Sequence, residues 1–311
     1  MPPRRILVTG AGGFVGGHLM QTLAATFPGA ALDAAAFDIT DAAGVNAAIQ
    51  AAPPDALVHL AAVSAIPAAR QDPDRAWRVN LHGTLTLARA LLAHAPACTM
   101  VFASSADVYG ASFRGERPLA EDALPAPLNT YAATKAAAEL ALGAMVGEGL
   151  RVVRVRAFNH TGPGQAPDFV VPAFAEQVAR IAAGLQPPVL RVGDLTPFRD
   201  FLDVRDVCAA YAACLARSDM LTPGTVLNLA SGQPRRVGDI LAALMARQVT
   251  GVGQMVDVSM MDGAMSFIAY HASEPMFGDC DPAGIVFFPN FSKWMDASSL
   301  NFFVNCGVPT W

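Results

Sequence analysis

A short apolar run followed at once by closely spaced glycines constrains the start of this chain most. Arg5–Thr9 predicts a buried strand, and Gly10, Gly13 and Gly16 follow it just ahead of a helical pattern over His18–Leu23. Glycines let the backbone turn sharply and approach a ligand closely, while the first turn of a helix offers unpaired N–H groups to a phosphate. The glycine motif alone is weak evidence, but between a strand and a helix it indicates a dinucleotide-binding βα unit.

Strands and helices are predicted to alternate over most of the chain. Further strands are expected at Ala56–Leu60, Thr99–Ala103, Arg151–Ala157 and Val226–Leu229, and helices at Gly83–His94 and Tyr131–Val146. Such alternation is typical of an α/β fold, here a doubly wound parallel (Rossmann) sheet. The segment 29–41 is shorter than a second strand, a loop and a third strand normally require.

The composition excludes several broad classes of protein. Hydrophobic residues make up 53% of the chain and charged residues 15%, which argues against disorder, and a net charge of −5 without a basic block argues against nucleic acid as a partner. No apolar run reaches the roughly 18 residues of a membrane span, and the start leaves no room for a secretory leader. Five scattered cysteines indicate neither a disulfide framework nor a metal site. We expect a cytoplasmic protein that binds no metal, membrane or nucleic acid.

The composition changes abruptly near residue 247. Residues 1–247 hold 55 alanines and all 19 arginines, whereas the last 64 residues hold 5 alanines and no arginine. The charges follow the same division, with 20 basic and 20 acidic residues before the change and 1 basic and 6 acidic residues after it. A shift of this size indicates a boundary, so we expect one domain over 1–247 and a tail of different origin.

Tyr131 and Lys135 form the main chemical signal. Residues four apart on a helix project from the same face, and an ammonium beside a phenol favours the phenolate, so Lys135 is expected to lower the pKa of Tyr131. Lys135 is the only lysine in the first 292 residues, which argues against a chance pair, because a compact ammonium tunes a neighbouring pKa as a guanidinium does not. Ser105 or Ser104, expected at the carboxyl end of a strand, can hold the oxygen that Tyr131 protonates.

Asp38 has two interpretations that the sequence leaves open. It lies in the tract 37–41 and could accept a hydrogen bond from the adenine or ribose of a dinucleotide. It could equally be the N-cap of a helix that starts near Ala42. Because no acid or arginine clearly follows the second strand, the choice between NAD and NADP stays open as well.

Five ordered motifs over residues 4–246 resemble the extended short-chain dehydrogenase/reductases, a family that acts on nucleotide-sugars. They are Gly10-x-x-Gly-x-x-Gly16, His59-Leu-Ala-Ala62, Asn80-Leu-His-Gly-Thr84, Ser104-Ser-Ala-Asp-Val-Tyr-Gly110 and Tyr131-x-x-x-Lys135. The resemblance implies a catalytic triad of Ser105, Tyr131 and Lys135, and gives Asn80 the role of supporting the active-site helix. The implied contacts with NADP or NAD are Gly10, Gly13, Phe14, Val15, Gly16, Asp38, Ile39, Leu60, Ala61, Ala62, Asn80, Tyr131 and Lys135.

Two later tracts resemble enzymes of GDP-mannose metabolism, most closely the GDP-6-deoxy-4-keto-mannose reductases. They are residues 158–165 and 199–206, which place a sugar contact on Asn159 and a diphosphate contact on Arg199. A guanidinium fork suits phosphate, although Arg199 could instead form a surface ion pair with Asp200 or Asp203. The implied substrate contacts are Ser104, Asp107, Asn159, Val170 and Arg199.

One departure from the family pattern narrows the reaction. Dehydratases of the family carry a general acid directly after the catalytic hydroxyl, and here Ala106 and Asp107 stand in those places. Dehydration is therefore not expected, and no cysteine near the site supports 3,5-epimerisation. The resemblance implies NAD(P)H-dependent reduction of a C4 ketone, with GDP-4-keto-6-deoxy-D-mannose giving GDP-D-rhamnose. Alternatives are a nucleotide-sugar C4 epimerase and an inactive dinucleotide-binding remnant. A homodimer is implied by the resemblance only.

The tail resembles two other families. Residues 251–263 resemble part of the family III CoA-transferases, whose catalytic aspartate would fall at Asp262, and residues 277–311 resemble the start of the hot-dog 4-hydroxybenzoyl-CoA thioesterases, with theirs at Asp281. Fragments over 248–275 and 276–311 are too short to bury their own apolar faces, so acyl-CoA chemistry is a remote alternative. We interpret the chain as a chimera whose small substrate lobe is incomplete; the alternative is a divergent lobe that only echoes these motifs.

Overall fold

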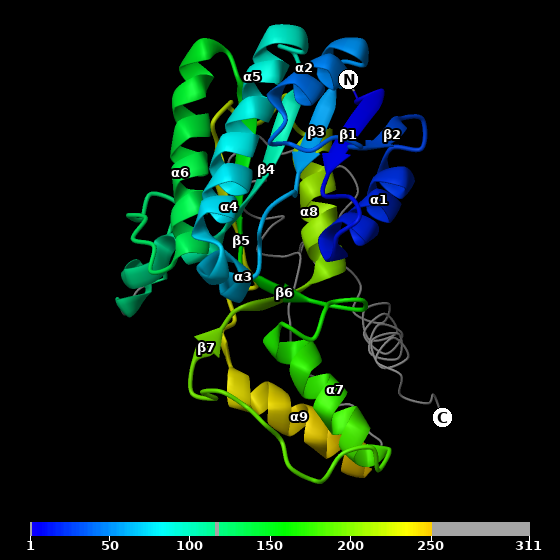
Figure 1. Ribbon diagram of the computed structural model, residues 1–311, viewed down its shortest axis with the longest axis vertical. Coiled ribbons are helices and arrows are strands. Elements are labelled where there is room, and N and C mark those ends of the chain that lie inside the picture. Colours follow the sequence, from blue (N-terminus) through cyan, green and yellow to red (C-terminus); the bar gives the residue numbers. More distant parts are fainter. Residues whose placement is uncertain (1, 116–117, 251–311) are drawn as a thin grey trace, which may run out of the picture.

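The centre of the protein is a six-stranded parallel sheet (Figure 1). The computed structural model describes residues 2–115 and 118–250. The strands are β1 (Arg5–Thr9), β2 (Ala31–Ala34), β3 (Ala56–His59), β4 (Thr99–Ser105), β5 (Arg151–Ala157) and β9 (Val226–Leu229). They pair in the order β2-β1-β3-β4-β5-β9, which confirms the predicted doubly wound sheet. The order reverses between β1 and β3, and a ligand crevice is expected outside the carboxyl ends of strands at such a point.

Helices cover both faces of this sheet. On one face lie α1 (Phe14–Thr26) and α8 (Val204–Ala216), and on the other lie α2 (Ala42–Ala51), α5 (Thr84–His94) and α6 (Thr130–Met145) (Figure 1). Successive strand residues point to opposite faces, so Ile6 and Val8 join the core beneath α1 and α8 while Leu7 joins the core on the other side. Both faces are apolar because a parallel sheet covered by helices on each side is buried throughout.

Two local features depart from the regular βα pattern. The chain passes from β2 directly to α2, so the short segment 29–41 holds one four-residue strand, in line with its length. Ahead of α5, a π-helical turn over Arg78–Gly83 carries Asn80 into the interior. The other short elements are α3 (Ile66–Gln71), α4 (Pro73–Trp77) and the 3-10 helices Ala106–Arg114 and Val146–Glu148.

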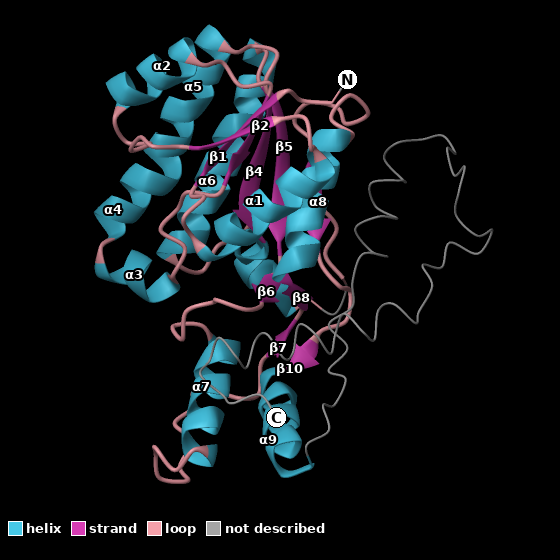
Figure 2. Ribbon diagram, turned by 90° about the vertical axis from the view of Figure 1, so that its right-hand side faces the viewer, coloured by secondary structure: helices cyan, strands magenta, loops and turns pink. Residues whose placement is uncertain are grey.

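A smaller lobe lies beyond the carboxyl edge of the sheet (Figure 2). Its helices α7 (Val170–Ala182) and α9 (Val237–Thr250) pack through a small apolar cluster that includes Phe174, Val178 and Leu241. Two ribbons connect it to the sheet: β6 (Asn159–Thr161) with β8 (Phe201–Asp203), and β7 (Phe198–Arg199) with β10 (Arg235–Arg236). The predicted boundary at residue 247 falls within α9, and Asp262, Asp281 and the rest of 251–311 lie outside the described residues.

Candidate active site

The glycine turn after β1 is too tight for side chains. Gly10 has φ +73°, and a Cβ there would lie 2.8 Å from the Ala61 nitrogen, while a Cβ on Gly16 would lie 2.3 Å from the Gly10 carbonyl oxygen. Helix α1 begins at Phe14 without a side-chain cap from Gly13. The turn therefore presents helix N-terminal N–H groups beside β3, which fits the diphosphate of a dinucleotide.

His59 locks the strands beneath this turn, a role that the motif did not reveal. Its Nδ1 lies 2.6 Å from the Thr9 hydroxyl and its Nε2 lies 2.8 Å from the Thr84 hydroxyl. Burial lowers the pKa of His59 to about 3, with the Lys135 charge acting in the same direction. A neutral imidazole thus joins β1, β3 and α5 directly below Leu60–Ala62, the residues expected to face the cofactor.

The structure removes one interpretation of Asp38. Asp41, not Asp38, caps α2 by accepting a hydrogen bond from the Ala43 N–H at 3.1 Å. The Asp38 carboxylate is exposed and accepts from the N–H and the hydroxyl of Thr40, both at 2.8 Å, which lowers its pKa. The next residue, Ile39, is buried against the π-helical turn, so its side chain is not available to a cofactor as expected.

Helix α6 and the end of β4 bring the predicted triad together. Asn129 caps the helix through the Ala132 N–H at 2.9 Å, which fixes where Tyr131 and Lys135 start their shared face. The Ser105 hydroxyl is a hydrogen-bond partner of the Tyr131 phenol. The Lys135 Nζ donates to the Ala103 carbonyl at 2.7 Å and lies 4.8 Å from the centre of the Phe102 ring.

The predicted lowering of the Tyr131 pKa is wrong in this structure. Burial raises the pKa of Tyr131 to about 12, the hydrogen bond with Ser105 acts against that rise, and the Asp107 charge adds to it. The Lys135 ammonium is directed to the Ala103 carbonyl, and burial lowers its own pKa to about 7. Tyr131 is therefore a neutral phenol at neutral pH, ready to give a proton rather than to take one.

Asn80 supports the active-site helix from below, as expected. Its Oδ1 accepts from the Val63 N–H at 2.7 Å, and its Nδ2 donates to the Val63 carbonyl at 3.2 Å and to the Thr134 hydroxyl at 2.9 Å. Thr134 lies on α6 between Tyr131 and Lys135. Because Asn80 is fully buried and its amide is engaged in these bonds, its expected contact with the cofactor is not available.

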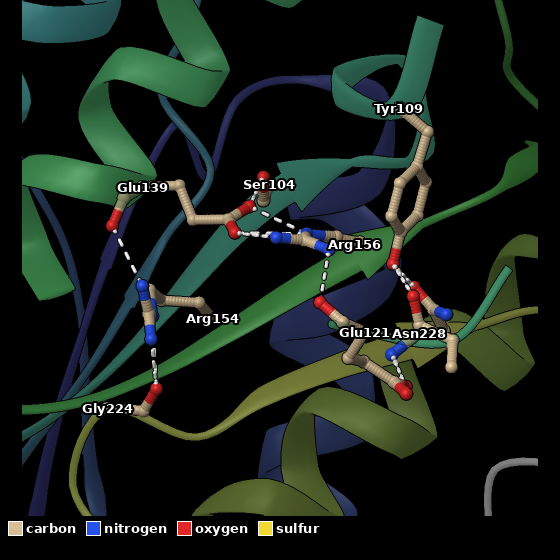
Figure 3. A network of polar contacts seen from close by, with 9 residues as sticks. Ser104, Tyr109, Glu121, Glu139, Arg154, Arg156, Gly224 and Asn228 are labelled. Atoms are coloured by element: carbon tan, nitrogen blue, oxygen red, sulfur yellow. Dashed lines mark hydrogen bonds and ion pairs between the residues drawn. The ribbon is translucent and has the colours of Figure 1, made fainter. Parts of the chain in front are cut away.

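A buried ion pair lies behind the triad (Figure 3). Glu139, one turn after Lys135 on α6, pairs with Arg156 of β5 at 2.5 Å, and both side chains are about 5% exposed or less. The Ser104 hydroxyl donates to the same carboxylate at 2.6 Å. Ser104 is therefore turned into the interior, and its expected contact with the substrate is wrong in this structure.

The ion pair extends into a network that the sequence analysis missed (Figure 3). The Arg156 guanidinium lies 4.6 Å from the Tyr109 ring centre and donates to the Glu121 carbonyl at 2.9 Å. The Tyr109 hydroxyl donates to Asn228 Oδ1 at 2.7 Å, and the Asn228 N–H donates to the Glu121 carboxylate at 2.6 Å. The only local signal was Glu139, four residues after Lys135 on an otherwise alanine-rich helix face.

Asp107 and Arg199 face the triad from two different elements. Burial raises the pKa of Asp107, and the Arg199 charge opposes that rise, so the two groups share one electrostatic environment. Asp107 follows Ser105 in the 3-10 helix Ala106–Arg114, whereas Arg199 is exposed on β7. The expected substrate contacts Asp107 and Arg199 thus lie on the same side as the catalytic hydroxyls.

The alternative ion pairs of Arg199 are not formed. Asp203 pairs with Arg205 at 2.7 Å, and Asp200 accepts from the main-chain N–H groups of Ser231 and Gly232 at 2.8 and 2.7 Å. Arg199 donates to the neighbouring Phe198 carbonyl instead. Its fork therefore remains open to a ligand.

The sugar-contacting tract packs against the dinucleotide turn. His160 stacks on Phe14 with ring centres 6.4 Å apart, and His18 lies 2.9 Å from the Pro163 carbonyl oxygen. Asn159 is exposed at the start of β6, and Val170 is exposed at the start of α7. The structure thus places the two halves of the predicted site, cofactor turn and sugar tract, in direct contact.

Two further searches cover the described part of the chain. Residues 2–115 and 118–250 contain no group of three or more His, Cys, Asp or Glu side chains placed to hold a metal ion. Within those same residues, no helix has the length and apolar character needed to cross a membrane.

The tail matches families unrelated to a dinucleotide fold. A family model described as CoA-transferase family III matches residues 213–284. A 4-hydroxybenzoyl-CoA thioesterase from Pseudomonas sp. (strain CBS-3) is 66% identical over 35 residues, which is 11% of this chain and 25% of that protein. Both predicted resemblances of the tail are confirmed.

The remainder of the chain matches one family throughout. A model of the NAD dependent epimerase/dehydratase family matches residues 6–230. GDP-6-deoxy-D-mannose reductase from Pseudomonas aeruginosa is 41% identical over 244 residues, covering 78% of this chain and 79% of that protein. Among solved structures, RMD from Pseudomonas aeruginosa complexed with NADPH is 39% identical with a TM-score of 0.73, covering 79% of this chain and 82% of that one. The UDP-glucose 4-epimerase of Thermus thermophilus in complex with NAD is 26% identical with a TM-score of 0.66, covering 86% and 99%. The chain therefore belongs to the NAD dependent epimerase/dehydratase family, the extended short-chain dehydrogenase/reductases.

Proposed function

We propose that this protein reduces the C4 ketone of a nucleotide-linked deoxy-sugar with NADPH or NADH, converting GDP-4-keto-6-deoxy-D-mannose to GDP-D-rhamnose. The observation that carries the proposal is the neutral Tyr131 phenol beside Ser105 at the end of β4. A ketone reduction needs a proton donor at the carbonyl oxygen, and this pair supplies one. The 41% identity with a GDP-6-deoxy-D-mannose reductase supports the substrate.

The residues of the site divide the work of the reaction. The glycine turn and Leu60–Ala62 would hold the dinucleotide, which when bound supplies hydride to C4. Ser105 donates a hydrogen bond to the C4 oxygen and orients it, and Tyr131 gives that oxygen its proton as negative charge develops. Lys135, buried one turn away, holds Tyr131 and the end of β4 in register through the Ala103 carbonyl. Ala106 offers no acid for expelling a hydroxyl, so dehydration is not part of this chemistry.

The test is the oxidation of NADPH and NADH by the purified chain supplied with GDP-4-keto-6-deoxy-D-mannose. We expect stoichiometric cofactor consumption, and a fall of about 100-fold or more in Tyr131→Phe that still binds NADPH. An epimerase would change the sugar without net consumption, because it returns the hydride. Protein that binds NADPH but turns nothing over would support the remnant alternative and overturn the reductase proposal. Hydrolysis of an aryl-CoA would support the thioesterase alternative.

We further propose that the chain is a chimera, with a reductase over 1–247 followed by CoA-transferase-like and thioesterase-like fragments. The two unrelated matches of the tail and the change in composition support this division. Cytoplasmic location and a homodimer also remain proposals; the free, buried Cys98, Cys208 and Cys214 are compatible with a reducing compartment. Cell fractionation and light scattering of the purified chain test these two points, and a periplasmic or monomeric protein would contradict them.

A further inference from the structure

Two arginines lie directly opposite each other on the ribbon that joins the lobe to the sheet. In the antiparallel pair of β7 and β10, Arg199 is opposite Arg235, and Phe198 is opposite Arg236. Directly opposed residues of such a pair project from the same face, so the Arg199 and Arg235 guanidiniums are neighbours, while Arg236 projects from the other face. Like charges in this arrangement destabilise a ribbon unless an anion lies between them.

Neither guanidinium is neutralised by an ion pair within residues 2–115 and 118–250. Arg235 Nη2 donates to the uncharged Gln233 side chain at 3.0 Å, and its Nε is buried without a hydrogen-bond partner among the described residues. The nearest carboxylate along the chain, Asp200, is engaged by two main-chain N–H groups of the loop before β10. The pair therefore offers free charged donors that are already held in place.

The position of the pair indicates which anion it suits. The β7–β10 ribbon lies between the carboxyl edge of the sheet and α9 (Figure 2), and the Arg199 charge reaches Asp107 beside the catalytic Ser105. An anion on this ribbon would thus lie within reach of the triad. A diphosphate carries two adjacent charged groups, and each can take a bidentate guanidinium fork. A carboxylate or a single phosphate would engage only one of the two arginines fully.

We propose that Arg235 binds the diphosphate of a nucleotide-linked sugar together with Arg199. The proposal rests on the proposed function for the substrate class, and adds to it a second guanidinium that no motif indicated. Because the diphosphate does not react, this contact is equal in the ground state and the transition state. It acts on substrate affinity and leaves the rate of the chemical step unchanged.

The test is calorimetric titration of the full chain with GDP at saturating NADPH. Arg235→Gln should weaken GDP binding by about 10-fold or more, as expected for a lost hydrogen bond to a charged group. The matched control is Arg236→Gln, since Arg236 is exposed on the opposite face of the same two-residue strand; its GDP affinity should change by less than about 2-fold. Thermal unfolding of both variants shows that each is folded.

Several outcomes separate this inference from the proposed function. Equal GDP affinity of Arg235→Gln and the unmutated protein, or no GDP binding by either, would overturn the role of Arg235. An equal KM of the two proteins for the keto-sugar would overturn it as well, while leaving the reductase intact. GDP binding that depends on Arg235 in a chain that reduces no keto-sugar would support the diphosphate site and sink the proposed function. Guanosine, which lacks the diphosphate, should bind all variants alike.

Discussion

At the scale of single residues, the site is shaped by what burial does to charge. Lys135 is 3% exposed and keeps one polar contact at 2.7 Å, so its pKa falls to about 7. The pKa of Tyr131 rises to about 12 in the same environment. Burial disfavours the charged form of both groups, which pushes the pKa of a base down and of an acid up. The result is a proton donor that stays neutral across the physiological range.

Replacing Lys135 by Met should stabilise the protein, and more so at low pH. The native pKa is about 7 against a usual value of 10.5, so the unfolded chain binds more protons between these limits. Stability therefore rises with pH from about 7 to 10.5, and the full cost of the buried ammonium is present below pH 7. We expect Lys135→Met to raise the melting temperature more at pH 6.5 than at pH 9.5. An equal shift at both pH values, measured by circular dichroism, would contradict the buried ammonium.

Gly16 and Gly17 give a matched pair of substitutions in the cofactor turn. A Cβ on Gly16 would lie 2.3 Å from the Gly10 carbonyl oxygen, whereas a Cβ on Gly17 would meet nothing within 4 Å. Gly16→Ala should open the turn and weaken NADPH binding by about 10-fold or more. Gly17→Ala should leave binding unchanged and stabilise α1 by about 0.5–1 kcal/mol. Fluorescence titration with NADPH checks both, and equal affinities would refute the tight turn.

At the scale of elements, α6 organises the site along a single face. Tyr131, Lys135 and Glu139 follow one another at intervals of four residues, so they contact in turn Ser105, the Ala103 carbonyl and Ser104 of β4. One helix thereby aligns its own catalytic groups with the end of one strand. Glu139 does this without reaching the substrate, and acts by positioning.

Glu139→Gln should destabilise the protein by about 3–5 kcal/mol, because it leaves the Arg156 charge buried and unpaired. The combined change of Glu139→Met and Arg156→Met should recover much of that loss, since both buried charges are then gone. A matched control is Glu176→Gln on α7, whose half-exposed pair with Arg180 at 3.9 Å should contribute no more than about 0.5 kcal/mol. Urea unfolding measures all three variants. A Glu139→Gln variant as stable as the control would show that the pair is not buried as described.

The same elements show what the sequence could predict. Apolar runs gave the bounds of β1, β5 and β9 as the structure has them, because a buried parallel strand needs such a run. Strand β4 extends to Ser105 rather than ending at Ala103, since its last residues pair with Arg156 and Ala157 of β5 and not with anything nearby in the chain. Pairing partners distant in sequence leave no local trace.

The site was predicted to the same degree and for the same reason. Ser105, Tyr131 and Lys135 stand in motifs whose spacing follows from one strand and one helix, and the structure brings them together. Ser104 was misassigned because two adjacent serines on a strand point to opposite sides, and only the position of Glu139 shows which one faces inward. Arg235 was missed because its neighbour Arg199 lies on a different strand.

At the scale of the whole molecule, the reacting groups belong to the sheet and the charged contacts to the ribbons of the small lobe. The contacts of the glycine turn, of α6 and of the Glu139–Arg156 network run to partners within the described residues. Cofactor binding is therefore a property of the sheet unit. Substrate binding depends in addition on how α7 and α9 hold β7 and β10.

A chain ending at Thr250 should consequently bind NADPH within about 3-fold of the full chain, a difference below about 0.7 kcal/mol. The reason is that the turn, His59 and α6 keep all of their described partners in the shorter chain. Fluorescence titration of both chains measures this, with circular dichroism to compare their melting temperatures. Loss of NADPH binding on removal of 251–311 would show that the tail is integral to the dinucleotide unit.

The polar network of Figure 3 also bears on the order in which the protein is assembled during synthesis. Its members Ser104, Glu121, Glu139, Arg156 and Asn228 come from distant points along the chain, and Asn228, on edge strand β9, is the last to be made. Long loops cost entropy that is recovered only when such distant contacts close. A ribosome must therefore release the chain past Leu229 before the catalytic helix acquires its final partners. Until then, the Glu139 and Arg156 charges wait in a half-built core, which makes this stretch of synthesis the point most dependent on chaperones.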